Sequence, residues 1–152
     1  MNSLLNLEAL RDVPVENDPY PYFTLEQALD PAQVMDIIAD FPDIPAGGSY
    51  TLSDVRVGPV FKRLLQAIDT PEFRQILDRK FDVDVAELPL MITLRGHSRN
   101  GKDGRIHTDS KSKVLTILIY LNESWPHETG RLRILRSKND MNDYAAEVPA
   151  GP

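Results

Sequence analysis

Hydrophobic residues recur at helical spacing in the first half of the chain. Asp30-Pro31 supplies a capping side chain followed by proline, and apolar residues then recur three and four positions apart until Pro42, which predicts a helix. Residues 59–68 carry a similar apolar stripe and predict a second helix. Thr70-Pro71 repeats the capping device, and the pattern that follows predicts a third helix through Phe81.

The second half of the chain changes to patterns typical of strands. Residues 88–94 are strand-like, and residues 114–121 (VLTILIYL) are rich in β-branched and aromatic side chains, which predicts a buried strand. Residues 130–135 alternate apolar and basic side chains and predict a strand with one face inward, whereas a short helix is expected over 140–146. Helices followed by strands indicate an α+β fold.

Composition fits one domain with a hydrophobic core. The chain has 152 residues, of which 41% are hydrophobic, so we expect a single domain over 1–152. Within it, 1–87 form a mainly helical region and 88–152 the region of strands. The lack of cysteine excludes a disulfide scaffold, a thiolate zinc site and a cysteine nucleophile.

Charge and hydropathy limit the classes of partner and the cellular location that we expect. A pI near 5.0 argues against nucleic acid as a partner. No apolar run approaches the roughly 20 residues of a membrane span, and residues 1–12 show no continuous apolar core of a signal peptide. We therefore expect a cytoplasmic protein that binds neither nucleic acid nor membranes.

Basic residues concentrate in one stretch. Residues 95–138 hold ten Lys and Arg against four acids, a local charge of +6, whereas the remaining residues hold seven against nineteen, a charge of −12. Such a stretch on an acidic protein suggests an anionic ligand, and a solvated face of mixed charge is the alternative.

The triplet His107-Thr108-Asp109 is the candidate for metal chemistry. In an extended segment residues i and i+2 point to the same side, so the imidazole and the carboxylate can hold one face of a metal ion. Two histidines and one carboxylate form the facial triad of non-haem Fe(II) oxygenases. Surface hydrogen bonding is the alternative role of such a short triplet.

The residues around this triplet carry a family resemblance. A turn containing Asn100-Gly101 precedes His107-Thr108-Asp109, then come Tyr120-Leu121-Asn122 with Trp125, and then Gly130-Arg131-Leu132. In order and spacing this stretch resembles the Fe(II)- and 2-oxoglutarate-dependent dioxygenases, and most of all the prolyl hydroxylases of oxygen sensing. The resemblance implies that His107 and Asp109 are two of three Fe(II) ligands.

The same resemblance implies a binding site for 2-oxoglutarate. Tyr120 falls where the family has a tyrosine whose hydroxyl contacts the distal carboxylate of 2-oxoglutarate, although an ordinary core tyrosine is an equal alternative. Thr116 and Leu118 alternate with Tyr120 and are expected to line the same pocket. His97 falls where relatives often have a cosubstrate-contacting tyrosine, so it is either a hydrogen-bond donor to 2-oxoglutarate or a loop residue.

The resemblance also implies a fold and a reaction. The expected core is a double-stranded β-helix (a jelly roll of the cupin kind) preceded by supporting helices. We expect this core to be incomplete at the C-terminus, because the family's distal histidine and cosubstrate-binding Arg or Lys follow on later strands. The expected reaction uses O2 and 2-oxoglutarate to hydroxylate an unactivated C–H bond with release of succinate and CO2.

The substrate and two alternatives stay open. A prolyl residue is one candidate substrate among proteins and small molecules, and ascorbate is a candidate further cofactor. The main alternative is a non-catalytic or truncated β-helix domain that binds a ligand or a protein. A soluble module with an incidental His-x-Asp triplet is the third possibility.

Overall fold

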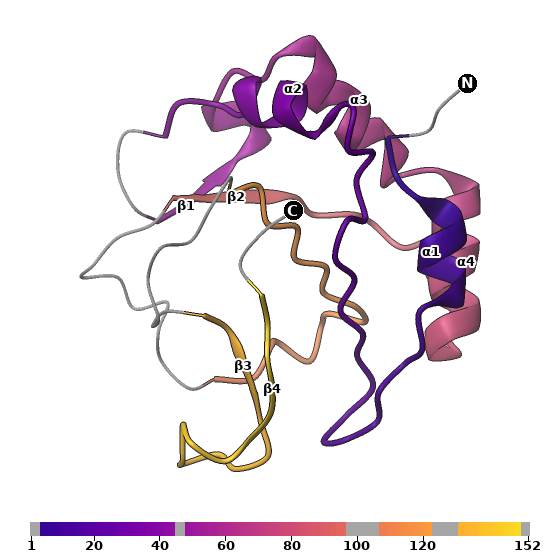
Figure 1. Cartoon of the computed structure of the whole chain (residues 1–152), viewed down its shortest axis with the longest axis vertical. Helices are drawn as coiled ribbons and strands as arrows, with labels where there is room; N and C mark the ends of the chain where they lie inside the picture. The colour runs from indigo at the N-terminus through magenta and orange to yellow at the C-terminus, as the bar shows by residue number, and fades with distance from the viewer. Residues whose placement is uncertain (1–3, 45–47, 97–106, 123–130, 150–152) are drawn as a thin grey trace.

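The computed structural model describes residues 4–44, 48–96, 107–122 and 131–149. Its elements follow one another as α1 (Leu7–Asp12), α2 (Val34–Ala39), β1 (Gly48–Thr51), η1 (Leu52–Asp54), α3 (Pro59–Ala67), α4 (Pro71–Phe81), β2 (Thr93–Gly96), β3 (Arg133–Leu135) and β4 (Tyr144–Glu147) (Figure 1). Helices combined with two small antiparallel sheets make an α+β structure, as the sequence predicts.

The three predicted helices form, and local capping explains where they begin. The Thr70 hydroxyl accepts a hydrogen bond from the Phe73 amide (3.2 Å) and donates to the Ala67 carbonyl (3.3 Å), which joins the end of α3 to the start of α4. The Asp40 carboxylate accepts from the Val60 amide at 2.7 Å in the first turn of α3. At α2 the Asp30 carboxylate instead accepts from the Ala32 amide (3.0 Å), so a turn precedes the helix.

The hydrophobic core lies mainly among the helices. Helix α4 contributes Phe73, Ile76 and Leu77, and α3 contributes Phe61 and Leu64, while Ile37 of α2 is fully buried. The remaining buried members of the cluster are Leu4, Leu5, Leu10, Leu29, Val85 and Leu94. Leu94 belongs to β2, so the β1–β2 sheet packs against the same core as the helices.

Helix α1 was not predicted, and it packs beside α4 (Figure 1). Its N-terminus is capped by Asn6, whose side-chain oxygen accepts a hydrogen bond from the Ala9 amide at 3.1 Å. An ion pair between Arg11 and Glu72 (2.5 Å) crosses from α1 to α4. The apolar contact comes from Leu10, which is buried in the core.

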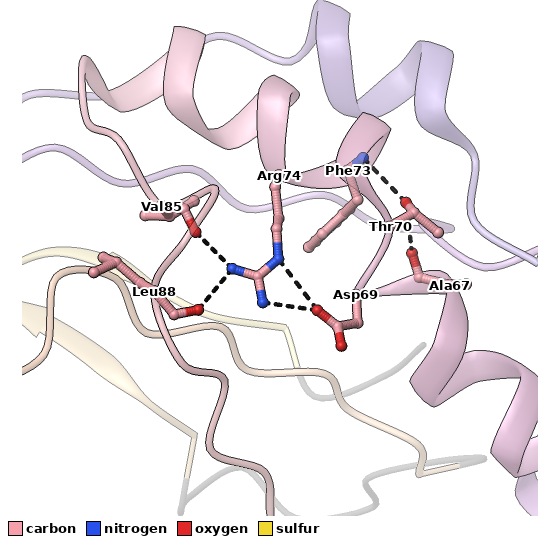
Figure 2. Close-up of polar contacts among 7 residues, drawn as sticks. All are labelled: Ala67, Asp69, Thr70, Phe73, Arg74, Val85 and Leu88. Atoms are coloured by element: carbon pink, nitrogen blue, oxygen red, sulfur yellow. Dashed lines mark hydrogen bonds and ion pairs between the residues drawn. The ribbon is translucent and has the colours of Figure 1, made fainter.

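Arg74 fixes the chain that leaves α4 (Figure 2). Its Nη1 donates to the carbonyls of Val85 (2.5 Å) and Leu88 (2.9 Å), and its Nη2 pairs with Asp69 Oδ1 at 2.7 Å. The arginine side chain is 17% exposed and its bond to the Val85 carbonyl is partly buried, whereas Asp69 is 53% exposed. One guanidinium thus ties the residues after α4 to the turn before it.

Two antiparallel strand pairs follow from different parts of the chain. In the first sheet Tyr50 of β1 lies opposite Leu94 of β2. In the second, Arg133 of β3 lies opposite Glu147 of β4, with an irregularity between Ile134 and Leu135. Strand β3 lies within the predicted strand at 130–135, whereas only the end of the predicted strand at 88–94 pairs, as the start of β2.

The prediction of a buried strand over 114–121 is wrong for the structure described. The exposed fractions of Val114, Ile117, Leu118 and Ile119 lie between 39% and 55%. Within the described residues, no backbone hydrogen bond joins this stretch to a neighbouring strand. A strand exists only with a partner, so β-forming residues alone do not create one.

The predicted helix over 140–146 is also wrong, because β4 occupies Tyr144–Glu147. Short polar side chains turn the chain before it: the Asp140 carboxylate accepts from the Asn142 amide at 2.9 Å, and the Ser137 hydroxyl accepts from the Asn139 amide at 3.2 Å. Such local bonds favour turns over helix.

The helices in the described part of the chain are short. None of the helices there is both long enough and apolar enough to cross a bilayer. The longest of those described, α4, has 11 residues.

Replacing Arg74 tests its role in the fold. Arg74→Met keeps the apolar stem but removes the arginine donor from the Leu88 and Val85 carbonyls, of which the Val85 carbonyl keeps a bond from the Leu88 amide at 3.1 Å. We expect the free energy of unfolding to fall by about 2 kcal/mol. Urea denaturation followed by circular dichroism measures this loss. Arg79→Met, at an exposed position of the same helix, is the matched control. Equal midpoints for the two variants would contradict the role given to Arg74.

Candidate functional site

The candidate metal ligands lie on an exposed segment. His107 and Asp109 are both exposed, and 48% of the Asp109 side-chain surface is accessible to solvent. After them the chain makes a turn in which the Lys113 amide donates to the Ser110 carbonyl at 3.0 Å. This turn brings the following residues back toward Asp109.

Asp109 has different neighbours at its two carboxylate oxygens. The Thr116 hydroxyl lies 2.6 Å from Oδ2 and donates to it, since an ionised carboxylate only accepts. The Lys113 ammonium lies 3.9 Å from Oδ1 and is itself 40% exposed. The structure therefore brings together two of the predicted site residues, Asp109 and Thr116.

The other residues predicted for the cosubstrate pocket are Tyr120, Leu118 and His97. Tyr120 is partly buried, and this burial raises the pKa of its hydroxyl above the ordinary value of 10.0. Like any tyrosine hydroxyl, it is a protonated donor at neutral pH. Leu118 is 55% exposed. His97 lies outside the described residues.

Two depressions in the described surface lie away from these residues. One is lined by Gln27, Leu29, Pro31 and Val34, and another by Arg11, Ile76, Arg79 and Lys80. Both are shallow surface features among the N-terminal helices and their loops. Neither gathers the mixture of donors and carboxylates that a metal or cosubstrate site needs.

The loop over residues 16–22 approaches the site, and the sequence pattern does not predict this approach. The pKa of Tyr20 is raised first by burial and second by the negative charge of Asp109. The base of this loop is closed by two backbone hydrogen bonds between Glu16 and Tyr22, of 2.7 and 2.9 Å. Asp18 accepts from Nε (3.0 Å) and Nη2 (2.9 Å) of Arg136. No local sequence pattern predicts contacts between residues so far apart in the sequence.

Part of the basic stretch is used within the fold. Glu147 accepts from Arg133 at 2.9 Å and lies 3.7 Å from Arg131. Arg136 is bound to Asp18, as described above. These three arginines neutralise carboxylates of the protein itself, so the +6 charge of the stretch overstates the charge available for an anionic ligand.

The donor chemistry of the described residues fits part of an iron site. A neutral imidazole and a carboxylate are suitable ligands for Fe(II), and His107 and Asp109 supply one of each. Among the residues described, no group of three His, Cys, Asp or Glu side chains gathers. His97 and His127 lie outside those residues, and the family resemblance places neither of them at the third ligand position, so the third ligand is not assigned.

Comparison with known proteins identifies no relative of this chain. No protein-family model matches the chain, and no curated protein or solved structure matches it significantly.

The alkaline titration of Tyr120 can be measured directly. Because its pKa in the folded protein is raised, burial of the neutral phenol contributes stability below about pH 10 that is lost as pH rises through the folded pKa. Absorbance at 295 nm follows tyrosine ionisation in the wild type and in Tyr120→Phe. The difference curve should have its midpoint above 10, and a midpoint at or below 10 would show that Tyr120 is not buried as described.

Proposed function

We propose that this protein is an Fe(II)- and 2-oxoglutarate-dependent oxygenase that hydroxylates an unactivated C–H bond and releases succinate and CO2. The observation that carries the proposal is the ordered motif in which His107-Thr108-Asp109 is followed by Tyr120-Leu121-Asn122 and Trp125. Several residues of chemically distinct types at the spacing of that family are less easily produced by chance than an isolated His-x-Asp triplet.

A double-stranded β-helix core is part of the proposal. The helices α1 to α4 precede the candidate site in the chain, and the antiparallel pair β3–β4 follows it. This order is compatible with helices that support a core of antiparallel strands. In such a core the 114–121 segment would acquire strand neighbours, and its exposed apolar side chains would become covered.

Each candidate residue then has a chemical role. His107 and Asp109 hold the iron, and the Thr116 hydroxyl orients the Asp109 carboxylate. Tyr120 offers a protonated hydroxyl to a carboxylate of 2-oxoglutarate, since a tyrosine hydroxyl keeps its proton at neutral pH. Bound iron with 2-oxoglutarate would supply the activation of O2. A prolyl residue is a candidate substrate by family resemblance alone.

Anaerobic spectroscopy tests the proposal. Fe(II) and then 2-oxoglutarate are added to the full chain, and a visible charge-transfer band is expected, followed by succinate after admission of O2. Asp109→Ala should abolish the band because it removes a ligand. Its side chain is half exposed, so we expect the variant to fold. Asp36→Ala, which removes an exposed carboxylate on α2, is the matched control and should keep the band.

Three outcomes decide against the proposal or a part of it. A correctly folded chain that gives neither band nor succinate would exclude the oxygenase. A band without succinate would favour the alternative of a non-catalytic domain that binds the same ligands. An unchanged band in Asp109→Ala would show that the carboxylate is not an iron ligand.

A further inference from the structure

We infer that Thr116 is a positioning residue for Asp109: its hydroxyl holds Oδ2 and leaves Oδ1 as the oxygen that binds the metal ion. The inference rests on the proposed function, since it concerns the orientation of one of the two proposed ligands. It also changes the role that the sequence suggests for Thr116, from lining the cosubstrate pocket to holding the carboxylate.

The geometry at Oδ2 supports this role. The oxygen–oxygen distance of 2.6 Å between Thr116 Oγ1 and Asp109 Oδ2 lies in the short range typical of a hydroxyl that donates to an ionised carboxylate. The hydroxyl has a single proton, and this bond uses it. Thr116 is therefore not available as a donor to 2-oxoglutarate, whereas the Tyr120 hydroxyl is a candidate for that role.

The geometry at Oδ1 differs. Its described neighbour is the Lys113 ammonium at 3.9 Å, the outer limit of an ion pair, and both side chains are exposed by two fifths or more. An ammonium on a flexible stem at this distance contributes little and can swing into solvent. A divalent cation can therefore replace Lys113 at Oδ1 without breaking the bond between Thr116 and Oδ2.

Removal of the Thr116 hydroxyl should weaken metal binding. Hydrogen-bond partners of metal ligands fix the ligand orientation, and their removal typically weakens metal binding about 10- to 100-fold. Lys113 acts in the opposite direction, because its positive charge opposes a cation at the same oxygen. The two neighbours of Asp109 thus give changes of opposite sign.

Mn(II) binding to the full chain tests this assignment without turnover. Thr116→Val keeps the shape of the side chain without the hydroxyl, and electron paramagnetic resonance of free Mn(II) should show affinity about 10- to 100-fold weaker than that of the wild type. Thr116→Ser keeps the hydroxyl and should restore most of the affinity. Lys113→Met should bind Mn(II) as tightly as the wild type or more tightly.

The outcomes separate this inference from the proposed function. If the wild type binds Mn(II) and Thr116→Val binds it equally well, the role of Thr116 is overturned while the metal site stands. If the folded wild type does not bind Mn(II), the proposed function fails and the inference fails with it. Circular dichroism confirms folding of each variant, and Thr116→Ala serves if the valine variant does not fold.

Discussion

Burial of the apolar face of α4 is the constraint on which the rest of this structure depends. Phe73, Ile76 and Leu77 are each at most 6% exposed, and full burial of such side chains contributes about 1.5–3 kcal/mol each. Helix α1 packs against α4, and buried residues of α3 and β2 join the same core. Polar contacts then set the direction of the chain around this core. Thr70 joins the end of α3 to the start of α4, and Arg74 holds the residues that lead from α4 toward β2.

Elements were predictable where the determining interactions are local. Helix α4 was predicted because a hydroxyl and a proline at its start, together with an apolar stripe, are all visible in the sequence. The prediction of a strand over 114–121 failed, because a strand depends on neighbours that a sequence pattern does not supply. The expected helix at 140–146 failed for the opposite reason: Ser137 and Asp140 make local hydrogen bonds that compete with helix formation.

In the candidate site, too, local relations between residues were predictable and contacts that depend on the fold were not. His107 and Asp109 are close in the sequence, so their spacing could be interpreted chemically without a structure. That Thr116 would bond to Asp109 could not be derived, because it depends on the turn that begins at Ser110. The approach of Tyr20 to Asp109 depends on a loop whose tip is bound by Arg136. The sequence of this loop has no pattern that predicts Asp109 as a neighbour.

The carboxylates of this region differ in how much of their charge is left for a cation. Glu147 lies between two guanidinium groups, and Asp18 accepts two hydrogen bonds from Arg136. A metal ion at either position would have to break strong charge-assisted contacts and meet nearby positive charge. Among the described residues, Asp109 accepts a hydrogen bond from a neutral hydroxyl, and its ion-pair partner is the distant, exposed ammonium of Lys113. Of these three carboxylates, Asp109 therefore keeps the largest part of its negative charge for a ligand, and it is the one that the His-x-Asp motif places beside an imidazole.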